Sequence, residues 1–332
     1  MRNNSEVTKL NLKETQMAIK SLKDYFQRDL SNTLNLARVT APIMVRPETG
    51  LNDNLGEGEK AVHFKTKNYK INIEIVQSLA KWKRNALEEY GFKCYEGLYT
   101  DMNAIRPNEE LDEIHSLYVD QWDWEKIIKK EDRNEDFLKM IVKEIYEVFK
   151  RSEEYINQVY PHAFTKKLPD EIFFIDSQEL LDMYPNLDAK GRERAITKEK
   201  KAVFIMRIGK ELSNGEPHDK RSADYDDWDL NGDILFYNPT LGDALELSSM
   251  GIRVDKESLS RQIKHLHQEE KLEMKFHQDI LEEKLPFTVG GGIGQSRMCM
   301  FFLEKRHIGE VQASVWDEAT IEFAKKNNIV LL

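Results

Sequence analysis

The feature that most constrains the fold of this chain is residues 288–305, where spaced glycines lead into an apolar run. Gly290, Gly292 and Gly294 alternate along the segment, and Arg297 follows three residues after the last of them. Glycines at alternating positions remove the Cβ atoms from one face of an extended segment, so a flat ligand can lie against the backbone. The apolar run that follows has helical spacing. The stretch therefore predicts a strand that opens into a helix.

Arg297 falls near the N-terminus of this predicted helix, where the helix dipole and free N–H groups favour anions. A strand, a helix and an arginine in this order suggest a site for ATP. The phosphate-binding Walker loop is excluded, because no Lys-Ser or Lys-Thr pair follows the glycines. The Rossmann dinucleotide motif would require its glycines in a tight turn, whereas these glycines have a different spacing.

Composition narrows the class of protein. The 332 residues suffice for one large domain or two small ones, and 40% hydrophobic residues support a packed core. No run approaches the roughly 18 apolar residues of a membrane span, and the first residues do not resemble a signal peptide. The net charge of −10 argues against a surface that holds long nucleic acids. We therefore expect a cytoplasmic protein without a membrane or nucleic-acid partner.

The N-terminal region predicts a long amphipathic helix over residues 12–36, with apolar side chains at spacings of three and four. Residues 39–45 form an apolar, β-favouring run that contains Pro42. Because proline cannot donate a hydrogen bond to a strand ladder, we expect this run to be an edge strand or to have a special pairing. Further along, residues 62–64 and 71–75 alternate as the two strands of a hairpin.

Ser78 is predicted to cap a helix whose first turn carries Lys81, Lys83 and Arg84. Basic side chains in a first turn are disfavoured by the helix dipole, which invites a functional reason for them. A solvated helix face is the alternative for each of the three residues, and the pattern leaves both explanations open.

Two further alternating segments, residues 98–106 and 117–125, flank a loop that contains proline and acidic residues. Paired as an antiparallel hairpin, they would present Arg106, Gln121 and Asp123 on one shared surface. Alternation alone does not fix the register of such a pair, so the shared surface depends on the predicted pairing.

The remaining segments mix helices and strands, without an internal repeat or a low-complexity linker. A helix is expected over residues 134–158, and a second helical region runs from its cap at Asp255 to residue 281. A turn is expected at residues 231–233. Strands are expected over residues 173–175, 203–208, 234–237 and 244–253.

Several charged residues stand in strand and turn contexts rather than on helix faces. Glu246 with Asp233 suits Mg²⁺, which takes one or two protein carboxylates beside phosphate oxygens. For any single acid a surface charge or a cap is the alternative, whereas their collection beside a glycine-floored groove favours a function. Guanidinium groups suit phosphate and carboxylate oxygens. The full set of such residues is Arg106, Arg221, Arg297, Asp53, Asp123, Asp226, Asp233 and Glu246.

The spacing Gly-x-Gly-x-Gly-x-x-Arg over residues 290–297 resembles motif 3 of class II aminoacyl-tRNA synthetases. The helix and proline-containing run of residues 1–47 resemble motif 1, which forms the dimer interface of that class, and the hairpin of residues 98–125 resembles motif 2. Nine segments, in order, look like the ammonia-dependent asparagine synthetases: residues 53–55, 78–84, 96–100, 118–124, 187–194, 224–228, 231–235, 246–253 and 290–297.

The resemblance implies an α+β fold, with one class II synthetase-like catalytic domain over residues 1–332 and motif 3 within residues 286–305. The domain would have a mostly antiparallel sheet flanked by helices and would form a homodimer. The implied reaction is the ATP-dependent amidation of L-aspartate by ammonia. The β-carboxylate would attack the α-phosphate of ATP to give β-aspartyl-AMP and pyrophosphate, and ammonia would then displace AMP to give asparagine.

The resemblance also implies roles for single residues. Arg106 would hold the α-phosphate and the reacting carboxylate, as a catalytic residue together with Gln121 and Asp53. The triphosphate would lie along Gly292, Gly294 and Arg297, with Mg²⁺ placed by Asp233 and Glu246. The residues expected to grip aspartate or polar groups of the nucleotide are Ser78, Lys83, Asp123, Arg221, Asp226, Ser249 and Arg253.

The expected nitrogen donor is free ammonia. Asp53 would bind ammonium and accept its proton, since only free ammonia is nucleophilic. Glutamine-using synthetases carry an N-terminal nucleophilic cysteine in a separate domain, for which we expect no room in a chain that begins Met1-Arg2. The two cysteines are Cys94, before a strand, and Cys299, within an apolar helix where a buried thiol is inert.

Three rival functions remain open at this point. A fragment or paralogue of a class II synthetase for aspartate, asparagine or lysine would share the chemistry, although the acidic charge and the lack of an anticodon-binding domain count against it. A non-catalytic regulatory subunit should have lost the arginines of motifs 2 and 3, and both are present. A mixed α/β domain whose polar strands are merely surface would have to explain Arg297 after three spaced glycines.

Overall fold

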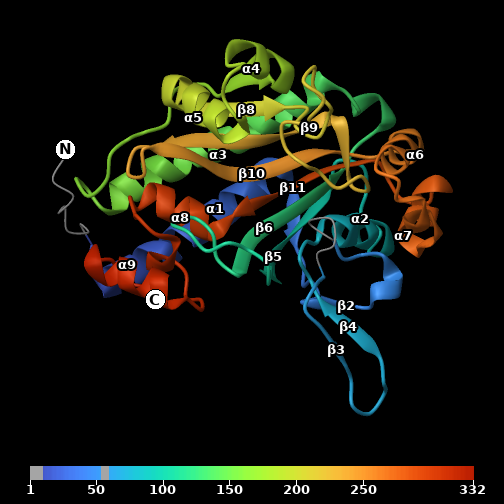
Figure 1. Ribbon diagram of the computed structural model, residues 1–332, viewed down its shortest axis with the longest axis horizontal. Helices are drawn as coiled ribbons and strands as arrows, with labels where there is room; N and C mark the ends of the chain where they lie inside the picture. The colour runs from blue at the N-terminus through green and yellow to red at the C-terminus, as the bar shows by residue number, and fades with distance from the viewer. Residues whose placement is uncertain (1–9, 54–59) are drawn as a thin grey trace.

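An eight-stranded sheet forms the centre of the molecule (Figure 1). The structure is a computed structural model that describes residues 10–53 and 60–332. The strands of the sheet are β1 (Leu36–Arg38), β5 (Gly97–Ile105), β6 (Tyr118–Ile127), β7 (Phe173–Asp176), β8 (Ala202–Met206), β9 (Asp226–Asn238), β10 (Asp243–Arg253) and β11 (Thr288–Gly294). They lie in the order β1-β5-β6-β11-β10-β9-β8-β7. All neighbours are antiparallel except the two edge pairs, β1 with β5 and β7 with β8.

A smaller sheet lies beside the large one. It consists of β2 (Met44–Val45), β3 (His63–Lys65) and β4 (Asn72–Ile75), in the order β2-β4-β3. The strands β3 and β4 form the predicted hairpin, which projects from the body of the molecule (Figure 1). Residues 54–59, just before this hairpin, and residues 1–9 of the motif 1-like segment lie outside the described residues.

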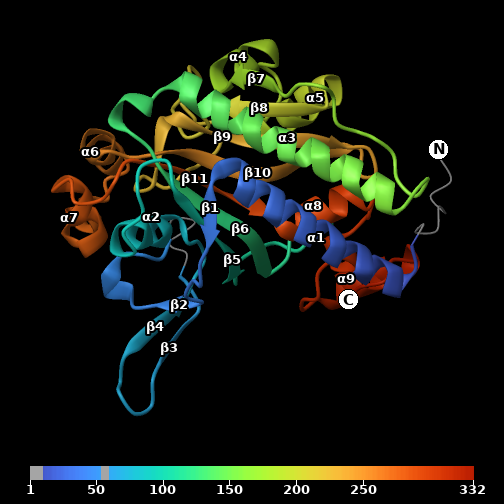
Figure 2. The same ribbon diagram turned by 180° about the vertical axis from the view of Figure 1, so that it is seen from behind.

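The helices divide between the two faces and the ends of the sheet. Helices α1 and α3 run side by side across one face (Figure 2), while α2 packs against β6 and β11. Within the described ranges, no helix is both long and apolar enough to cross a membrane. The helices are α1 (Leu12–Leu34), α2 (Ala80–Glu89), α3 (Glu135–Val159), α4 (Ser177–Met183), α5 (Ala189–Lys200), α6 (Lys256–His265), α7 (Lys275–Leu281), α8 (Gln295–Phe302) and α9 (Glu318–Lys326), with short 3-10 turns η1 (Pro47–Thr49), η2 (Lys130–Asp132), η3 (Glu269–Glu273) and η4 (Ile308–Glu310).

The sequence sets the ends of the two long helices by capping. Asn11 precedes α1 and forms a capping box with Glu14, and Asn35 ends it in the left-handed region at φ 57°. Asn134 precedes α3, and its side chain accepts a hydrogen bond from the Phe137 N–H. Both helices therefore begin and end close to the residues that their apolar periodicity predicts.

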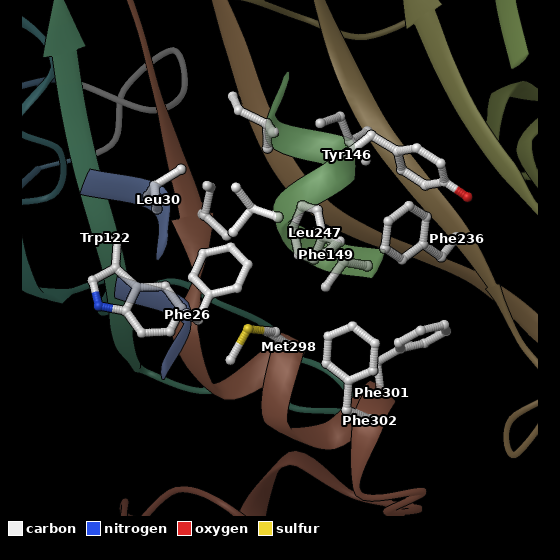
Figure 3. Close-up of a cluster of buried hydrophobic side chains, with 14 of the residues drawn as sticks. Phe26, Leu30, Trp122, Tyr146, Phe149, Phe236, Leu247, Met298, Phe301 and Phe302 are labelled. Carbon is white, nitrogen blue, oxygen red and sulfur yellow. The ribbon is translucent and has the colours of Figure 1, made fainter. Parts of the chain in front are cut away.

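The main core lies between α1, α3, α8 and the sheet (Figure 3). Phe26 of α1 stacks on Trp122 of β6, with ring centroids 4.7 Å apart. Phe149 of α3 contacts Phe26 at 5.0 Å and Phe236 of β9 at 5.1 Å. These aromatic contacts join helices and strands that are far apart in the sequence.

Replacing Phe149 by alanine is expected to destabilise the fold by about 3–5 kcal/mol, because the ring is fully buried and the rigid walls around it would leave a cavity. Chemical denaturation at equilibrium measures the change in the free energy of unfolding. Phe323→Ala on α9, where the side chain is 41% exposed, is the matched control and should change stability by less than about 0.5 kcal/mol. A loss below about 1 kcal/mol for Phe149→Ala would contradict this description of the core.

The strand expected over residues 39–45 does not form as a single element. β1 ends at Arg38 and pairs with the large sheet, whereas β2 covers only Met44–Val45 and pairs with the small one. Between them the chain passes from one sheet to the other through Pro42, which has no N–H for a ladder. The apolar run predicted one strand because pattern alone cannot show a change of sheet.

Three other local predictions need correction. β9 runs straight through residues 231–233, where a turn was expected. Gly232 is needed there because a Cβ would lie 2.4 Å from the Ile205 carbonyl oxygen. The helical region after Asp255, which does cap α6, is broken by η3 before α7. Ser78 was expected to be the capping residue of α2, but the residue directly before this helix is Leu79. Ser78 Oγ still accepts a hydrogen bond from the Ala80 N–H, at 3.2 Å.

Candidate active site

A cavity of about 360 Å³ lies on the face of the sheet opposite the main core. The side chains of β6 alternate between the two faces: Trp122 and Trp124 enter the core, whereas Gln121 and Asp123 line the cavity. Arg106 follows the end of β5 and lines the same cavity. The predicted hairpin therefore brings Arg106, Gln121 and Asp123 to one surface.

The glycines of β11 let the side chains of β6 fold over its backbone. A Cβ on Gly290 would lie 1.9 Å from Glu125 Oε2, and a Cβ on Gly292 would lie 2.3 Å from Gln121 Oε1. Such contacts are far shorter than any real Cβ makes, so a side chain at either position would have to displace the Glu125 carboxylate or the Gln121 amide from its place. The strand and helix predicted from residues 288–305 are confirmed as β11 and α8.

A cluster of buried charges lies at one end of the cavity. Arg253 Nε donates to Glu125 Oε1 at 3.0 Å, and Arg253 Nη1 donates to Asp226 Oδ1 at 2.5 Å. Lys83 Nζ lies 3.6 Å from Asp123 Oδ2 and 3.9 Å from Glu125 Oε2. Burial raises the pKa of Asp123 and of Asp226; the charges of Lys83 and Arg253 oppose the shift at Asp123, and those of Arg253 and Arg221 oppose it at Asp226. An ammonium group bound against Asp123 would add a further positive charge and stabilise its carboxylate form.

Helix α2 supplies basic side chains to buried partners rather than to solvent. Lys83 Nζ donates to the Gly291 carbonyl oxygen at 2.9 Å, and Lys81 Nζ donates to Asp224 Oδ2 at 2.9 Å. Arg84 is bound to backbone carbonyl oxygens, and burial lowers its pKa to about 10. The solvated-face alternative is therefore wrong for all three residues of this first turn.

Two arginines face the cavity with donors to spare. Arg297 Nη1 lies 3.2 Å from the Glu246 carbonyl oxygen and 3.7 Å from Glu246 Oε2. Arg106 Nε is buried without a hydrogen-bond partner in the described structure, and Glu109 approaches the Arg106 guanidinium only to 3.9 Å. A guanidinium has five N–H donors, so both side chains keep capacity for an anionic ligand.

The N-terminus of α8 is less available to an anion than the sequence suggested. The Ser296 N–H donates to Asp120 Oδ1 at 3.1 Å, and Ser296 Oγ donates to Asp120 Oδ2 at 2.8 Å. The carboxylate of Asp120 therefore already interacts with the positive end of the helix dipole. The guanidinium of Arg297, rather than free N–H groups, is therefore what this helix offers to an anionic ligand.

Asp233 does not lie on the cavity wall. Both of its carboxylate oxygens accept hydrogen bonds from Arg221 Nη2, at 2.6 and 2.5 Å. Burial raises the pKa of Asp233 to about 8; the charge of Arg221 opposes this, and the nearby carboxylates of Glu246 and Asp219 add to it. Glu246 does line the cavity, on the strand β10 that pairs with β9.

Of these two acids, Glu246 is the one open to a divalent cation, because Arg221 covers both carboxylate oxygens of Asp233. Asp233 and Glu246 lie close enough for the charge of one to perturb the other, so a cation between them would relieve their repulsion. Among the described residues no group of three or more potential ligands gathers for a metal. A single open carboxylate such as Glu246 is compatible with Mg²⁺, which takes one or two carboxylates and completes its shell with phosphate oxygens and water.

Asp53 is fully buried, and within the described ranges neither of its carboxylate oxygens has a hydrogen-bond partner. Burial raises its pKa, Lys81 opposes that shift, and the negative charge of Asp224 adds to it. Asp224 itself is held by Lys81 and by His277 Nε2, each 2.9 Å from its Oδ2. A buried carboxylate with unused acceptors on a cavity wall fits a small donor-rich cation such as ammonium.

All but one of the predicted site residues line this single cavity, and Asp233 is the exception. The carboxylates of Glu125 and Asp120 and the amide of Gln312 also belong to the wall or its support and were missed. Glu125 continues the alternation of β6 two residues after Asp123, so the pattern could have found it. The residues that do line the cavity are Asp53, Ser78, Lys83, Arg106, Gln121, Asp123, Arg221, Asp226, Glu246, Ser249, Arg253, Gly292, Gly294 and Arg297.

Neither cysteine takes part in this site. Cys94 is exposed and Cys299 is buried in α8. Burial raises the pKa of the Cys299 thiol to about 12, so almost no thiolate exists at neutral pH. The expectation that this thiol is inert agrees with its surroundings.

The fold and the cavity define a class II aminoacyl-tRNA synthetase-like catalytic domain. The chain is similar in structure to the asparaginyl-tRNA synthetase of Pyrococcus horikoshii complexed with asparaginyl-adenylate, with a TM-score of 0.64 at 18% identity over 90% of this chain and 68% of that one. The asparaginyl-tRNA synthetase of Entamoeba histolytica in complex with asparaginyl-adenylate gives a TM-score of 0.63 at 14% identity, over 91% of this chain and 66% of that one. Likeness at this level of identity establishes the fold alone.

Sequence relatives then identify the family. Residues 13–328 match the family model of the aspartate-ammonia ligases. The aspartate–ammonia ligase of Clostridium tetani is 61% identical over 98% of this chain and 95% of its own length. That of Fusobacterium nucleatum is 58% identical over 98% of this chain and 99% of its own length. The chain belongs to the aspartate-ammonia ligase family.

Proposed function

We propose that this protein makes asparagine by the ATP-dependent amidation of L-aspartate with ammonia, through β-aspartyl-AMP, with release of AMP and pyrophosphate. The observation that carries the proposal is the cavity, where two arginines with spare donors lie beside a buried cluster that contains Asp123, Glu125 and Asp226. The arginines suit phosphate and carboxylate oxygens, and the cluster suits the ammonium group of an amino acid. Membership of the aspartate-ammonia ligase family supports the same reaction.

The aspartate would bind at the charged end of the cavity. Its α-ammonium would lie against Asp123, whose partner Lys83 is 3.6 Å away and does not satisfy it fully. Arg253 is already bound by Glu125 and Asp226 and would act chiefly by fixing these acids in place. Further polar contacts to aspartate or the nucleotide would come from Ser78, Arg221, Asp226 and Ser249, which line the same cavity.

In the first step the β-carboxylate attacks the α-phosphate, and pyrophosphate leaves in line. Arg106 would contact both the attacking carboxylate and an oxygen of the α-phosphate, and Gln121 would hold the carboxylate from the opposite strand. Arg297 would hold the triphosphate tail over the bare backbone at Gly292 and Gly294. Mg²⁺, held by Glu246 with Asp233 behind it, would supply positive charge to the phosphates.

In the second step Asp53 would hold ammonium through its two unused oxygens and accept a proton from it. The nitrogen lone pair then attacks the β-carbonyl carbon, the C–O bond to AMP breaks, and the proton lost from the attacking nitrogen leaves with solvent. Burial of Asp53 excludes bulk water, which would otherwise hydrolyse the adenylate. The elevated pKa of Asp53 makes it a stronger base than an exposed aspartate.

We also infer a cytoplasmic homodimer joined through the segment of residues 1–47. The supporting feature is exposed apolar surface: Ile43 is 52% and Met44 is 38% exposed at the start of β2, an edge strand of the small sheet. Sedimentation at micromolar concentration would show two copies, and Ile43→Asp would shift the mass to one. The net charge of −10 supports the absence of a nucleic-acid partner.

The test of this function follows three products from ATP and L-aspartate with and without ammonium. We expect AMP and pyrophosphate to form in an ammonium-dependent manner, with one asparagine for each AMP. Aspartate-dependent pyrophosphate exchange without free asparagine, together with transfer to tRNA, would favour a tRNA synthetase instead. Absence of any ATP turnover would favour a regulatory subunit, and glutamine should not replace ammonium.

A further inference from the structure

The cavity has two ends of different character: the end with the buried cluster of Glu125 and Arg253, and the opposite end near Arg297. Along β11, Gly290 faces the pair of Glu125 and Arg253, whereas Gly294 faces Arg297. With about 3.4 Å per residue along a strand, these positions lie roughly 14 Å apart. Toward the Gly294 end the cavity lining includes the apolar residues Ile114, Val119 and Ile308. An apolar recess next to a phosphate-binding arginine suits the base of a nucleotide.

One polar side chain, Gln312, reaches this recess from the segment after η4. That segment is tied to the loop between β5 and β6, because the Ile308 N–H donates to the Glu113 carbonyl oxygen at 2.8 Å. Gln312 Nε2 donates to Asp120 Oδ1 at 3.1 Å and to Ser296 Oγ at 3.2 Å. Both acceptors line the cavity beside Gln312.

These contacts fix which way the amide of Gln312 points. Asp120 also forms an ion pair with Lys23 at 2.9 Å, so it is a carboxylate and can only accept hydrogen bonds. Ser296 Oγ donates its proton to Asp120 Oδ2 at 2.8 Å and can only accept from Gln312. The amide nitrogen must therefore face these two groups, and Gln312 Oε1 must face away from them.

The oxygen of this amide has no partner of its own. Gln312 is 4% exposed, and its Oε1 accepts no hydrogen bond within the described ranges. A buried carbonyl oxygen without a donor is unfavourable, so the site is completed by a ligand that brings an N–H or O–H to it.

We propose that Gln312 recognises the base of the nucleotide, with Oε1 accepting a hydrogen bond from the exocyclic amino group of adenine. The inference rests on the proposed function, because it requires ATP in this cavity. Guanine carries a carbonyl oxygen at the equivalent position, and two facing acceptors repel. Gln312 is thus a specificity-determining residue for ATP over GTP.

The test compares ATP with purine riboside 5′-triphosphate, which has hydrogen in place of the amino group. For each nucleotide, kcat/KM is measured as aspartate-dependent pyrophosphate release in wild type and in Gln312→Met. Wild type should prefer ATP about tenfold, the usual effect of one hydrogen bond to a buried acceptor. Gln312→Met keeps the length of the side chain without an amide oxygen, and it should use both nucleotides equally within about twofold.

The ratio of kcat/KM for ATP to kcat/KM for purine riboside 5′-triphosphate distinguishes a contact to the base from a purely structural role of Gln312. Loss of the contacts from Gln312 to Asp120 and Ser296 would lower kcat/KM for both nucleotides alike and leave their ratio unchanged. An unchanged tenfold preference for ATP in Gln312→Met would therefore overturn the inference. Equal use of both nucleotides by wild type would overturn it as well. The control is Gln77→Met, a buried glutamine that does not itself line the cavity and should keep the wild-type ratio. If wild type released no pyrophosphate from ATP with aspartate, the proposed function would fall, and this inference with it.

Discussion

Arg106→Ala is expected to lower kcat/KM for adenylate formation about 10³-fold, the effect typical of removing an arginine that stabilises charge on a transferring phosphoryl group. Arg106 lies at the end of β5 on the cavity wall, and Glu109, at 3.9 Å, is its closest carboxylate among the described residues. Its donors are therefore available to the α-phosphate and to the attacking carboxylate. Arg106→Lys should recover little of the loss, because an ammonium cannot bridge two oxygens as a guanidinium does.

Because Arg106 has only a weak ion pair with Glu109, the loss of activity in Arg106→Ala can be measured without a loss of folding stability. Because Arg106 is partly exposed and has only a distant ion-pair partner, its removal should change the free energy of unfolding by less than about 0.5 kcal/mol. Arg38→Ala is the matched control: this arginine lies on the neighbouring strand β1, is 56% exposed and binds Asp101. Aspartate-dependent pyrophosphate exchange should stay within about twofold of wild type for Arg38→Ala. Retention of activity within tenfold in Arg106→Ala would contradict its role.

Asp53→Asn is expected to separate the two half-reactions. An amide cannot accept the proton of ammonium, so asparagine formation should fall by about 10²–10⁴-fold while pyrophosphate exchange with aspartate stays within about threefold. Hydroxylamine is a weaker base than ammonia and is largely unprotonated at neutral pH. The variant should therefore use hydroxylamine almost as well as wild type. Equal loss of both half-reactions would contradict the role of Asp53.

The raised pKa of Asp53 adds a pH test with a definite sign. Burial and the charge of Asp224 disfavour its carboxylate form, so amide formation at a fixed concentration of free ammonia should rise as the pH rises through the folded pKa, above the ordinary aspartate range. Ionising this group costs stability over the same interval, because the folded state binds the proton more tightly than the unfolded state. Asp53→Asn removes that cost, so its Tm at neutral pH should equal or exceed that of wild type.

The parts of the site that could be predicted follow from local pattern. The alternation in β6 placed Gln121 and Asp123 on one face, and the glycines of β11 predicted an open backbone beside them. Both features depend on the two-residue period of a strand, which a sequence shows directly. The sequence pattern was misleading at β9, where Gly232 indicated a turn. In the structure Gly232 lies within the strand, and its lack of a Cβ makes room for the backbone of the neighbouring strand β8.

The parts that could not be predicted depend on contacts between distant segments. Asp233 was expected to hold a metal from the cavity wall, but Arg221, twelve residues earlier, covers both of its oxygens. Gln312 meets Asp120 and Ser296 only because the segment after η4 folds back over the loop between β5 and β6. No spacing in the sequence links residues 120, 296 and 312.

The central claim is that the β-carboxylate of aspartate attacks the α-phosphate of ATP, and isotope transfer tests it most directly. L-Aspartate labelled with ¹⁸O in the β-carboxylate is converted with ATP and ammonium, and the nucleotide product is examined by mass spectrometry. Formation of β-aspartyl-AMP predicts one ¹⁸O in the phosphate of AMP and none in pyrophosphate. Appearance of ADP with ¹⁸O in inorganic phosphate would show attack on the γ-phosphate and would contradict the account.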